Sequence, residues 1–372
     1  MIKVLVVGQT PPPYHGQAIS IQLMLNGKYQ NVRLYHVRMS FSKEVVEIGK
    51  FKMNKLWHLL FIIISIYYKR FRHKTNILYY VPAGSNRIPM YRDFAILLAI
   101  RCLFKRIIFN FRATGISELY GKLSVIEQFF FRLAYFNTDL AISLSEFNPP
   151  DGEKLKAKRN IVIPNGLEDY YSKLKKVTKK AKSKPILLFV GILCESKGIM
   201  VLLDASRKLK EAGLPFFVRL MGRFESANFS STVERFIYYN GLAEYVEILG
   251  ECIGDDKWNH YNDADIFVFP TFYEIETMGR VILEAMHCEL PIVATRWRGI
   301  PSMIEDGKSG FLVPINDSQE LAEKIAILLK NPEKGQLMGK RGRQIYLEKF
   351  TAEKFWHNME EAFISIDNFS SR

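Results

Sequence analysis

Short apolar runs separated by longer amphipathic stretches recur along the whole chain. Runs that fit buried strands lie at 1–8, 77–81, 107–111, 140–143, 186–190, 216–220, 246–249, 266–269 and 291–294. Segments with helical periodicity follow several of them, at 19–25, 91–104, 124–136, 199–211, 318–329, 333–349 and 351–366. Because buried strands that alternate with helices form parallel sheets covered on both faces, we predict doubly wound α/β domains.

Between residues 169 and 184 the apolar periodicity disappears and lysines dominate. A charged stretch without periodic apolar positions is typical of a linker between domains. We therefore predict a first domain over residues 1–168 and a second over 185–350, joined by a linker at 169–184. The length of 372 residues is sufficient for about two to three domains with large cores.

The net charge of +14 is unevenly distributed along the chain. Residues 1–184 contain 31 Lys+Arg and 11 Asp+Glu, a net of +20, whereas the remainder contains 21 and 27, a net of −6. A basic first half favours an anionic membrane surface or an anionic acceptor as partner. Nucleic acid is the competing interpretation, but no helix-turn-helix, zinc-finger or RNP-type motif accompanies the charge, so we expect no nucleic-acid binding. A solvated basic face without a partner also stays open.

The longest apolar stretch, LWHLLFIIISIYY at 56–68, has 13 residues, short of the roughly 18–20 needed to span a bilayer. A cluster of basic residues follows directly at 69–74. Two interpretations stay open and do not exclude each other. The stretch is a helix lying in the membrane interface, or a crossover helix buried on the sheet.

The sequence carries no sign of export. Residues 1–7 run straight into a strand without the charged region and cleavage site of a signal peptide. The four cysteines form no C-x-x-C pair and no His cluster accompanies them, which favours reduced thiols. Together with the basic first half, these features predict a cytoplasmic protein that is peripheral on the inner face of the cell membrane.

The richest candidate chemistry lies at 270–295, where a strand, a loop, a helix and a second strand follow one another. The unpaired amides of Met278, Gly279 and Arg280 at the predicted helix start are suited to a phosphate. Glu276 precedes the helix and Glu284 lies one to two turns further on, so their carboxylates are roughly 8–12 Å apart. That distance is about the span from a sugar across a diphosphate to a ribose. The stretch therefore predicts a nucleotide-sugar site.

This stretch resembles the E-x7-E motif of retaining GT-B glycosyltransferases of the family-4, or glycosyl transferases group 1, type. It keeps the motif at Glu276, Gly279, Glu284-Ala285-Met286, Pro291 and Ala294-Thr295. It differs at Thr277-Met278, where the family prefers Gly-Phe, and at Glu289, where it prefers Gly. The resemblance implies that Glu276, in a catalytic role, contacts the hydroxyls of the donor sugar and that Glu284 contacts the ribose.

A second resemblance concerns the donor diphosphate. GILCESKG at 191–198 is similar to the family's G-R-L-x-x-x-K-G, whose Arg and Lys bind the diphosphate. Lys197 is kept, but Ile192 occupies the position of the Arg. A single lysine leaves the diphosphate charge under-compensated, and we predict that Arg223, which follows another strand, supplies the second cation.

The first domain resembles the family more weakly. Its proline-rich loop at 9–18 has His15-Gly16 where relatives often have two glycines, and Gly16 is predicted to line the donor site at a helix start. Where related enzymes place a histidine near the reacting sugar carbon, this chain has Arg112. We assign Arg112 a catalytic role in holding a phosphate or an acidic acceptor, and whether it or His15 replaces the usual histidine stays open.

The resemblance implies a GT-B fold, in which two Rossmann-like domains face each other across a cleft. The first domain would bind the acceptor, with a C-terminal helix at 351–372 packing back on it, and the second would bind the nucleotide-sugar. We interpret Asp265 of Asp263-Ala264-Asp265 as structural, so we expect no metal and no cofactor. The sequence shows no obvious enzymic nucleophile, and the resemblance implies attack on the face from which the diphosphate departs.

The implied function is a retaining glycosyltransferase (EC 2.4) that moves a sugar from a nucleotide diphosphate sugar to a saccharide acceptor. The basic first half and the 56–68 stretch favour a lipid-linked acceptor in the synthesis of a bacterial surface polysaccharide such as capsule, O-antigen, lipopolysaccharide or exopolysaccharide. Two alternatives stay open. One is a non-catalytic nucleotide-sugar-binding partner in a membrane assembly, and the other is a nucleotide-sugar epimerase of GT-B fold.

Overall fold

A computed structural model describes residues 1–12, 14, 16–39, 53–170 and 184–368. The chain divides into two compact units. Unit 1 contains Met1–Gly166 and Ala352–Arg372, and unit 2 contains Leu167–Thr351. Most of the predicted linker, at 171–183, lies outside the described residues, as does His15.

Unit 1 is built on a six-stranded parallel sheet in the order β2-β1-β3-β4-β5-β6. Its strands are β1 (Ile2–Gly8), β2 (Val32–Arg38), β3 (Ile77–Tyr80), β4 (Arg106–Asn110), β5 (Leu140–Ser143) and β6 (Asn160–Val162). Because β2 lies on one side of β1 and β3 on the other, the strand order reverses there. In such sheets ligands bind at the carboxyl ends of the strands.

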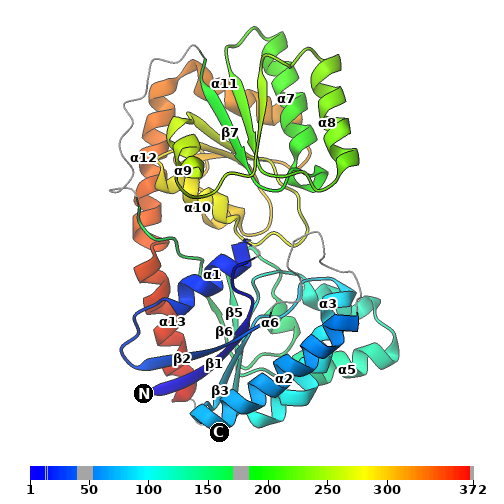
Figure 1. The fold of residues 1–372 in the computed structure, drawn as a ribbon. Helices are drawn as coiled ribbons and strands as arrows, with labels where there is room; N and C mark the ends of the chain where they lie inside the picture. Colours follow the sequence, from blue (N-terminus) through cyan, green and yellow to red (C-terminus); the bar gives the residue numbers. More distant parts are fainter. Residues whose placement is uncertain (13, 15, 40–52, 171–183, 369–372) are drawn as a thin grey trace. The chain divides into compact units, whose positions relative to one another are not determined.

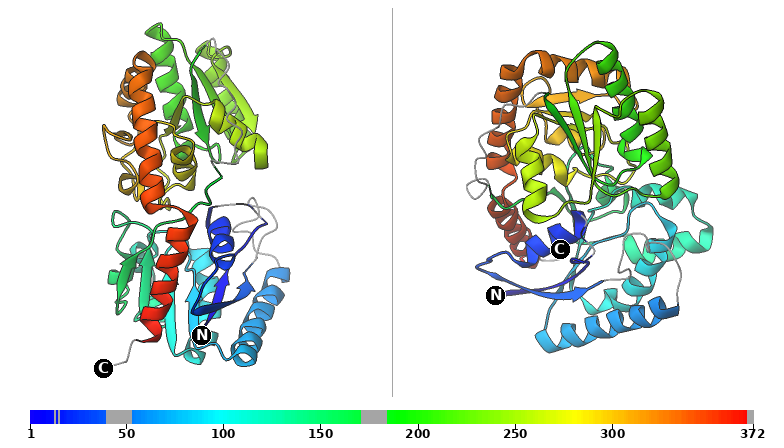
Figure 2. Two further views of the ribbon diagram at one scale, coloured as in Figure 1. Left: turned by 90° about the vertical axis from the view of Figure 1, so that its left-hand side faces the viewer. Right: turned by 45° about the horizontal axis from the view of Figure 1, so that its top comes forward.

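Helices cover both faces of this sheet (Figure 1). One face carries α2 (Met53–His73), α3 (Arg87–Ile100) and α5 (Val125–Tyr135), and the other carries α1 (Gly16–Leu25) and α13 (Ala352–Asp367). A hydrophobic core lies on each face of the sheet, and successive strand residues point into opposite cores. Leu5 packs towards α2, whereas Val4 packs towards α13. Figure 2 shows α13 in red alongside the strands of unit 1, although it follows unit 2 in the sequence.

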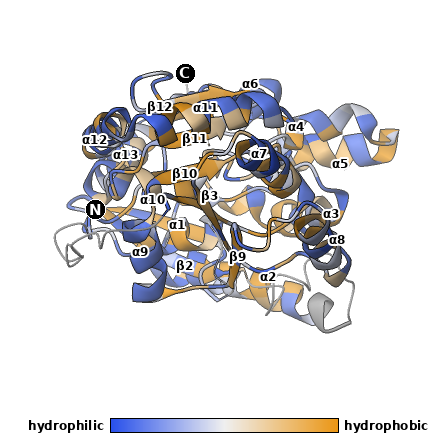
Figure 3. Cartoon of the chain, turned by 90° about the horizontal axis from the view of Figure 1, so that it is seen from above, coloured by the Kyte–Doolittle hydropathy of each residue, from blue (hydrophilic) through white to orange (hydrophobic). Residues whose placement is uncertain are grey.

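Unit 2 is built on a second six-stranded parallel sheet, in the order β12-β11-β10-β7-β8-β9. Its strands are β7 (Ile186–Val190), β8 (Phe217–Met221), β9 (Val246–Gly250), β10 (Ile266–Phe269), β11 (Ile292–Thr295) and β12 (Gly310–Val313). Its helices are α7 (Ile199–Glu211), α8 (Ala227–Tyr239), α9 (Gly254–Asp263), α10 (Arg280–His287), α11 (Ser318–Lys330) and α12 (Pro332–Lys349). In Figure 3 the strands β10 and β11 have hydrophobic colours, as expected for strands covered on both faces. The strand order reverses between β7 and β10.

Short helical pieces complete the two units. Unit 1 contains the short helices α4 (Ile116–Leu119) and α6 (Asp151–Lys154) and 3₁₀ turns at Arg101–Leu103 and Tyr120–Lys122. Unit 2 contains 3₁₀ turns at Glu195–Lys197 and Ile300–Ser302. The two Rossmann-like units confirm the predicted α/β fold class.

The apolar stretch at 56–68 lies within α2, and its two faces have different environments. Ile62 and Ile66 are buried in the core under the sheet, whereas Trp57, Phe61 and Ile64 are exposed. The helix is therefore a crossover helix that also presents an apolar outer stripe. Within the described ranges, no helix combines the length and the apolar character needed to cross a membrane.

Candidate functional site

Three loops of unit 2 meet at the carboxyl ends of β7, β8 and β10, which are neighbours in the sheet. The loop after β7 carries Lys197, the loop after β8 carries Arg223, and the loop after β10 carries Glu276. Since the strand order reverses between β7 and β10, this is the crevice where open α/β sheets bind their ligands. The sequence-predicted residues of unit 2 therefore gather at the edge of the sheet where a ligand is expected.

The ammonium of Lys197 and the carboxylate of Glu276 form an ion pair between Nζ and Oε2. Both side chains are largely buried, with 14% and 11% of their surface exposed. The Lys197 ammonium also lies 4.5 Å from the centre of the Tyr273 ring, where the π-face attracts a cation. A cation suited to a phosphate and a carboxylate suited to hydroxyls thus lie side by side.

Backbone contacts hold the Lys197 loop against the Glu276 loop. Gly198 has φ +79°, and a Cβ at this position would lie 2.0 Å from the carbonyl oxygen of Pro270. Next to it, the amide of Phe272 donates to the carbonyl oxygen of Ser196 at 2.8 Å. The loops approach this closely because residue 198 has no side chain.

The helix α10 begins directly after the Glu276 loop, and Gly279 caps it with φ +67°. Met278 is fully buried, while the side chain of Arg280 stays 13% exposed at the first turn of the helix. A helix start presents backbone amides and the positive end of the helix dipole, so an anion is favoured there. Figure 1 shows α10 in yellow below the strands of unit 2.

Glu284 lies on the second turn of α10 and is 3% exposed. Its Oε1 lies 2.6 Å from Lys257 Nζ, and its Oε2 accepts a hydrogen bond from Tyr261 Oη at 2.8 Å. Arg280 Nε lies 3.8 Å from Oε1. Burial, together with the nearby Glu284 charge, raises the pKa of Tyr261 well above its ordinary value. The carboxylate is thus surrounded by two cations and a hydroxyl donor.

Sequence reasoning missed Lys257 and Tyr261, which both lie on α9. The α9 segment has few apolar positions, so its periodicity predicts no helix. The available signal was their spacing, because residues four apart share one face of a helix.

Arg223 follows Gly222, whose φ is +147° and whose added Cβ would lie 1.7 Å from the carbonyl oxygen of Gly191. The carbonyl oxygen of Arg223 accepts a hydrogen bond from the amide of Leu193 at 2.9 Å. This contact brings Arg223 beside Ile192, the residue at the position of the missing arginine. The structure therefore places the backbone of Arg223 next to the segment that carries Ile192.

The two remaining candidates belong to unit 1. Gly16 is the first residue of α1 and is exposed, with nothing within 4 Å of an added Cβ. Arg112 follows β4 and is buried, and its Nη1 donates to Asn165 Oδ1 at 2.7 Å. Its guanidinium carbon lies 5.8 Å from the centre of the Phe355 ring on α13.

The segment that enters unit 2 is attached to the last turn of α10. The amide of Tyr170 donates to His287 Nε2 at 2.9 Å, and Arg343 Nη2 donates to Asp169 Oδ2 at 2.7 Å. His287 is fully buried, and its burial and then the charge of Arg343 lower its pKa to about 4. The ring is therefore neutral at pH 7, as its acceptor role requires.

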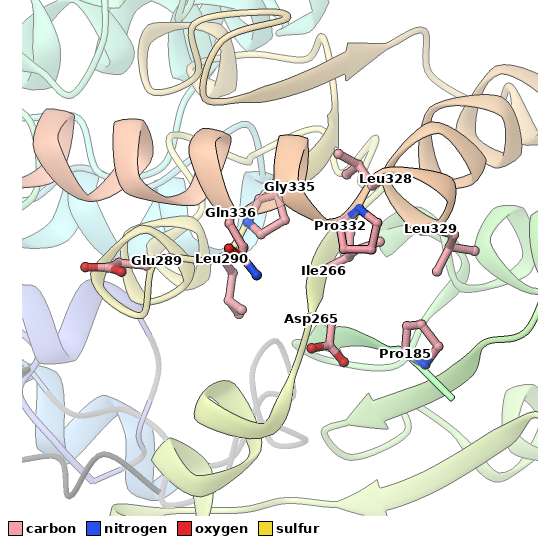
Figure 4. Close-up of a pocket in the computed structure, with 11 residues that line it drawn as sticks. Pro185, Asp265, Ile266, Glu289, Leu290, Leu328, Leu329, Pro332, Gly335 and Gln336 are labelled. Atoms are coloured by element: carbon pink, nitrogen blue, oxygen red, sulfur yellow. The ribbon is translucent and has the colours of Figure 1, made fainter. Parts of the chain in front are cut away.

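A cavity of about 310 Å³ lies elsewhere in unit 2 (Figure 4). Its lining includes Pro185 before β7, Asp265 before β10 and Pro291 before β11. These residues precede the strands, so the cavity opens at the end of the sheet opposite to Lys197 and Glu276.

Asp265 has a structural contact in this region, since its Oδ2 accepts a hydrogen bond from the amide of Ile186 at 2.9 Å. Asp263 forms an ion pair with Arg219, in which Asp263 Oδ2 lies 3.3 Å from Arg219 Nη1. Across the described residues, no group of three or more His, Cys, Asp or Glu side chains is arranged to hold a metal ion.

Comparison with known families confirms the resemblance seen in the sequence. Residues 171–345 match the model of the family described as Glycosyl transferases group 1. The chain is 29% identical over 240 residues to the uncharacterized glycosyltransferase MJ1178 of Methanocaldococcus jannaschii, covering 64% of this chain and 63% of that protein. It is 33% identical over 152 residues to the putative colanic acid biosynthesis glycosyltransferase WcaL of Escherichia coli, covering 40% of this chain and 37% of that protein. It is 26% identical over 199 residues to the capsular polysaccharide biosynthesis glycosyltransferase CapM of Staphylococcus aureus, covering 54% of this chain and 49% of that protein. The chain thus spans less than two thirds of each of these relatives.

Solved structures with the same fold cover almost the whole chain. Sucrose-phosphate synthase (tll1590) from Thermosynechococcus elongatus aligns with a TM-score of 0.77 and 17% identity, covering 100% of both chains. Anabaena Alr3699/HepE in complex with UDP-glucose aligns with a TM-score of 0.74 and 19% identity, covering 98% of this chain and 100% of that one. At this level of identity the likeness concerns the fold.

Proposed function

Because residues 171–345 carry a domain of the glycosyl transferases group 1 family, we propose that this chain is a glycosyltransferase. It transfers a sugar from a nucleotide diphosphate sugar to a saccharide acceptor and retains the configuration at the transferred carbon. The observation that carries the proposal is the Lys197–Glu276 pair beside the start of α10, at the strand-order reversal of the unit 2 sheet.

Each proposed donor contact follows from the chemistry of one group. Lys197, with Arg223 as second cation, meets the diphosphate together with the amides of Met278, Gly279 and Arg280. Glu276 accepts hydrogen bonds from the sugar hydroxyls once the diphosphate draws Lys197 towards itself. Glu284 accepts hydrogen bonds from the ribose hydroxyls, because its two oxygens have further lone pairs besides those that accept from Lys257 and Tyr261.

In the proposed reaction, the bond between the sugar carbon and the diphosphate oxygen breaks while the acceptor oxygen forms the new bond on the same face. Negative charge grows on the departing phosphate, and donors fixed before the reaction lower the barrier most. Lys197 and the α10 amides supply that stabilisation, so we propose a transfer without a metal or cofactor. The departing phosphate takes up the proton that the acceptor hydroxyl loses.

We further propose that the acceptor is lipid-linked and that unit 1 meets it, with Gly16 lining the donor side and Arg112 holding an anionic group. The outer stripe of α2 supports contact with an anionic membrane, since Trp57, Phe61 and Ile64 are exposed just before the basic residues at 69–74. Relatives named for colanic acid and capsular polysaccharide synthesis support a role in making a surface polysaccharide. The protein would then work at the inner face of the cell membrane.

The donor site is tested by thermal unfolding with a panel of UDP-, GDP- and ADP-sugars. A ligand that binds the folded state raises the melting temperature, and a tenfold excess over Kd corresponds to about 3–6 °C for domains of this size. We expect one nucleotide class to produce the shift and Lys197→Gln and Glu284→Gln to abolish it. Glu274→Gln is the matched control, because Glu274 lies exposed in the same loop as Glu276.

Turnover separates the proposal from its alternatives. With the identified donor and a membrane lipid extract, a glycosyltransferase forms a glycosylated lipid. An epimerase converts the nucleotide-sugar without any acceptor, and a non-catalytic partner binds the donor without product. If no nucleotide-sugar shifts the melting temperature of the wild type, the donor-site assignment is wrong.

A further inference from the structure

Arg112 in unit 1 is a buried cation whose charge has no acidic partner among the described residues. It is 6% exposed, and its Nη1 donates to the neutral amide oxygen of Asn165. Its Nε and Nη2 are buried and have no hydrogen-bond partner in the part of the chain that the structure describes. A buried guanidinium without a carboxylate is unfavourable, because the lost hydration is not replaced.

The two open nitrogens lie on the same edge of the guanidinium. Nε–H and one N–H of Nη2 point in parallel, and this edge binds the two oxygens of a carboxylate or phosphate in a bidentate manner. The bond from Nη1 to Asn165 fixes the rotation of the group and leaves that edge unused. The side chain is therefore already oriented for an oxyanion.

Other unsatisfied polar groups follow neighbouring strands. Asn110 at the end of β4 is fully buried, and Asn148 after β5 is 6% exposed. The amide oxygen and nitrogen of both side chains have no hydrogen-bond partner among the described residues. Asn165, the partner of Arg112, follows β6. Because β4, β5 and β6 are adjacent and parallel, these residues lie at one edge of the sheet, where ligands bind.

We propose that Arg112 binds an oxyanion of the substrate through Nε and Nη2, with Asn165 as the residue that positions it. The ligand is a sugar that bears a carboxylate, as in a uronic acid, or a phosphate, as in a sugar phosphate or a lipid-linked sugar phosphate. The excess of 31 Lys+Arg over 11 Asp+Glu in residues 1–184 agrees with an anionic ligand. This inference rests on the proposed glycosyl transfer and narrows its substrate to an acidic one.

The test uses the full chain with saturating UDP, so that the proposed diphosphate site is filled before a second anion is added. Inorganic phosphate, glucuronate and, as the neutral control, glucose are then compared by thermal unfolding for wild type and Arg112→Met. We expect phosphate or glucuronate to raise the wild-type melting temperature by about 3–6 °C at a tenfold excess over Kd. Glucose should give no shift, and the variant should respond to neither anion. A response to glucuronate alone identifies a carboxylate ligand, and one to phosphate alone a phosphate ligand.

The apo melting temperature separates a ligand site from a structural role. Removal of an unmatched buried charge should leave the melting temperature of Arg112→Met unchanged or raise it. If the variant melts well below the wild type and no anion shifts the wild type, Arg112 is a packing residue and the proposal is wrong. Arg112→Lys, which keeps the charge but lacks the bidentate edge, covers the case in which Arg112→Met fails to fold. We expect Arg112→Lys to raise the Kd for the anion at least tenfold, as measured by calorimetry. An unchanged Kd overturns the proposal.

The two proposals fail in different ways. If UDP does not raise the melting temperature of the wild type, the donor site in unit 2 is contradicted. A normal UDP response without an anion response that depends on Arg112 contradicts only the acidic-substrate inference.

Discussion

Gly198 joins two loops of the candidate donor site at a point where a side chain has no room. Its φ of +79° is unfavourable for other residues, and a Cβ would lie 2.0 Å from the carbonyl oxygen of Pro270. We expect Gly198→Ala to lower the free energy of unfolding by about 2–4 kcal/mol, from backbone strain and the displaced loop. Chemical denaturation measures this loss.

The control for that substitution is Gly213→Ala. Gly213 also has a positive φ, +68°, but nothing lies within 4 Å of its added Cβ. Its substitution should lower the free energy of unfolding by about 1–2 kcal/mol, from backbone strain alone. Equal losses at the two positions would show that the contact with Pro270 is unimportant.

His287 makes stability depend on pH. Its pKa is about 4 in the folded chain because of burial and the charge of Arg343, against 6.5 ordinarily. Above pH 6.5 the ring is neutral in both states and contributes no pH dependence. As the pH falls from 6.5 to 4, the unfolded chain takes up the proton first, so stability declines by up to about 3 kcal/mol.

Denaturation of the wild type and His287→Asn at pH 7 and pH 4.5 tests this expectation. The difference in stability between the two pH values should be smaller in the variant by about 2–3 kcal/mol. Equal pH dependence in the two proteins would contradict the neutral, buried state of the ring.

At the scale of elements, α2 exposes one continuous apolar stripe. The stripe consists of Trp57, Phe61, Ile64, Tyr68 and Phe71, each more than 60% exposed. Their spacing of four, three, four and three residues places them on one side of the helix. On the same face of the sheet, α5 adds exposed apolar residues at Val125, Ile126, Phe129, Phe130 and Leu133. An apolar surface of this extent, close to basic residues, fits an anionic bilayer.

We expect Phe61→Ser with Ile64→Ser to weaken binding to vesicles that contain phosphatidylglycerol at least tenfold, because two inserted side chains are lost. Cosedimentation measures the loss. The control is Tyr238→Ser with Tyr239→Ser on α8, where two exposed aromatic residues lie outside the stripe. If both pairs reduce binding equally, the stripe is not the membrane surface.

Burial explains several of the successes and failures of the sequence prediction, although β12, whose four residues are all buried, was also missed. The strand β7 and the helix α7 were predicted with the bounds that the structure has, because their apolar positions are periodic and buried. The strands β2 and β6 were missed because they lie at the edges of their sheet, where few side chains are buried. The helix α9 was missed because its surface is polar.

The same reasoning explains what was predicted of the site. Lys197 and Glu276 were found because each lies in a recognisable segment after a strand, and the structure pairs them. Lys257 was not found, because its ion pair with Glu284 joins residues 27 positions apart. The open edge of Arg112 depends on Asn165, 53 positions away, and such a pairing leaves no local signal in the sequence.

At the scale of the whole molecule, unit 1 is made from two separate parts of the chain. The helix α13 contributes Phe355, Met359, Phe363 and Ile366 to the core of unit 1, all at most 2% exposed. Each buried side chain of this size stabilises by about 1.5–3 kcal/mol, so four amount to roughly the whole stability of a typical domain. Truncation after Thr351 should therefore unfold unit 1.

Unit 2, in contrast, is continuous from Leu167 to Thr351. We expect the fragment 167–351 to fold alone and to bind the donor nucleotide, whereas 1–166 alone should lack a cooperative unfolding transition. Circular dichroism and thermal unfolding of both fragments check this. A cooperative transition for 1–166 would contradict the role of α13.

The position of α13 also sets an order of events on the ribosome. The sheet of unit 1 and α1 are synthesised first, but α13, which shares one face of that sheet with α1, follows only after all of unit 2. At roughly 5–20 residues per second, the nascent sheet waits about 10–40 s for that helix. Throughout this interval the part of the face that α13 covers is open to chaperones and to neighbouring nascent chains, while unit 2 can already complete its own core. The unit whose synthesis begins first therefore completes its core last.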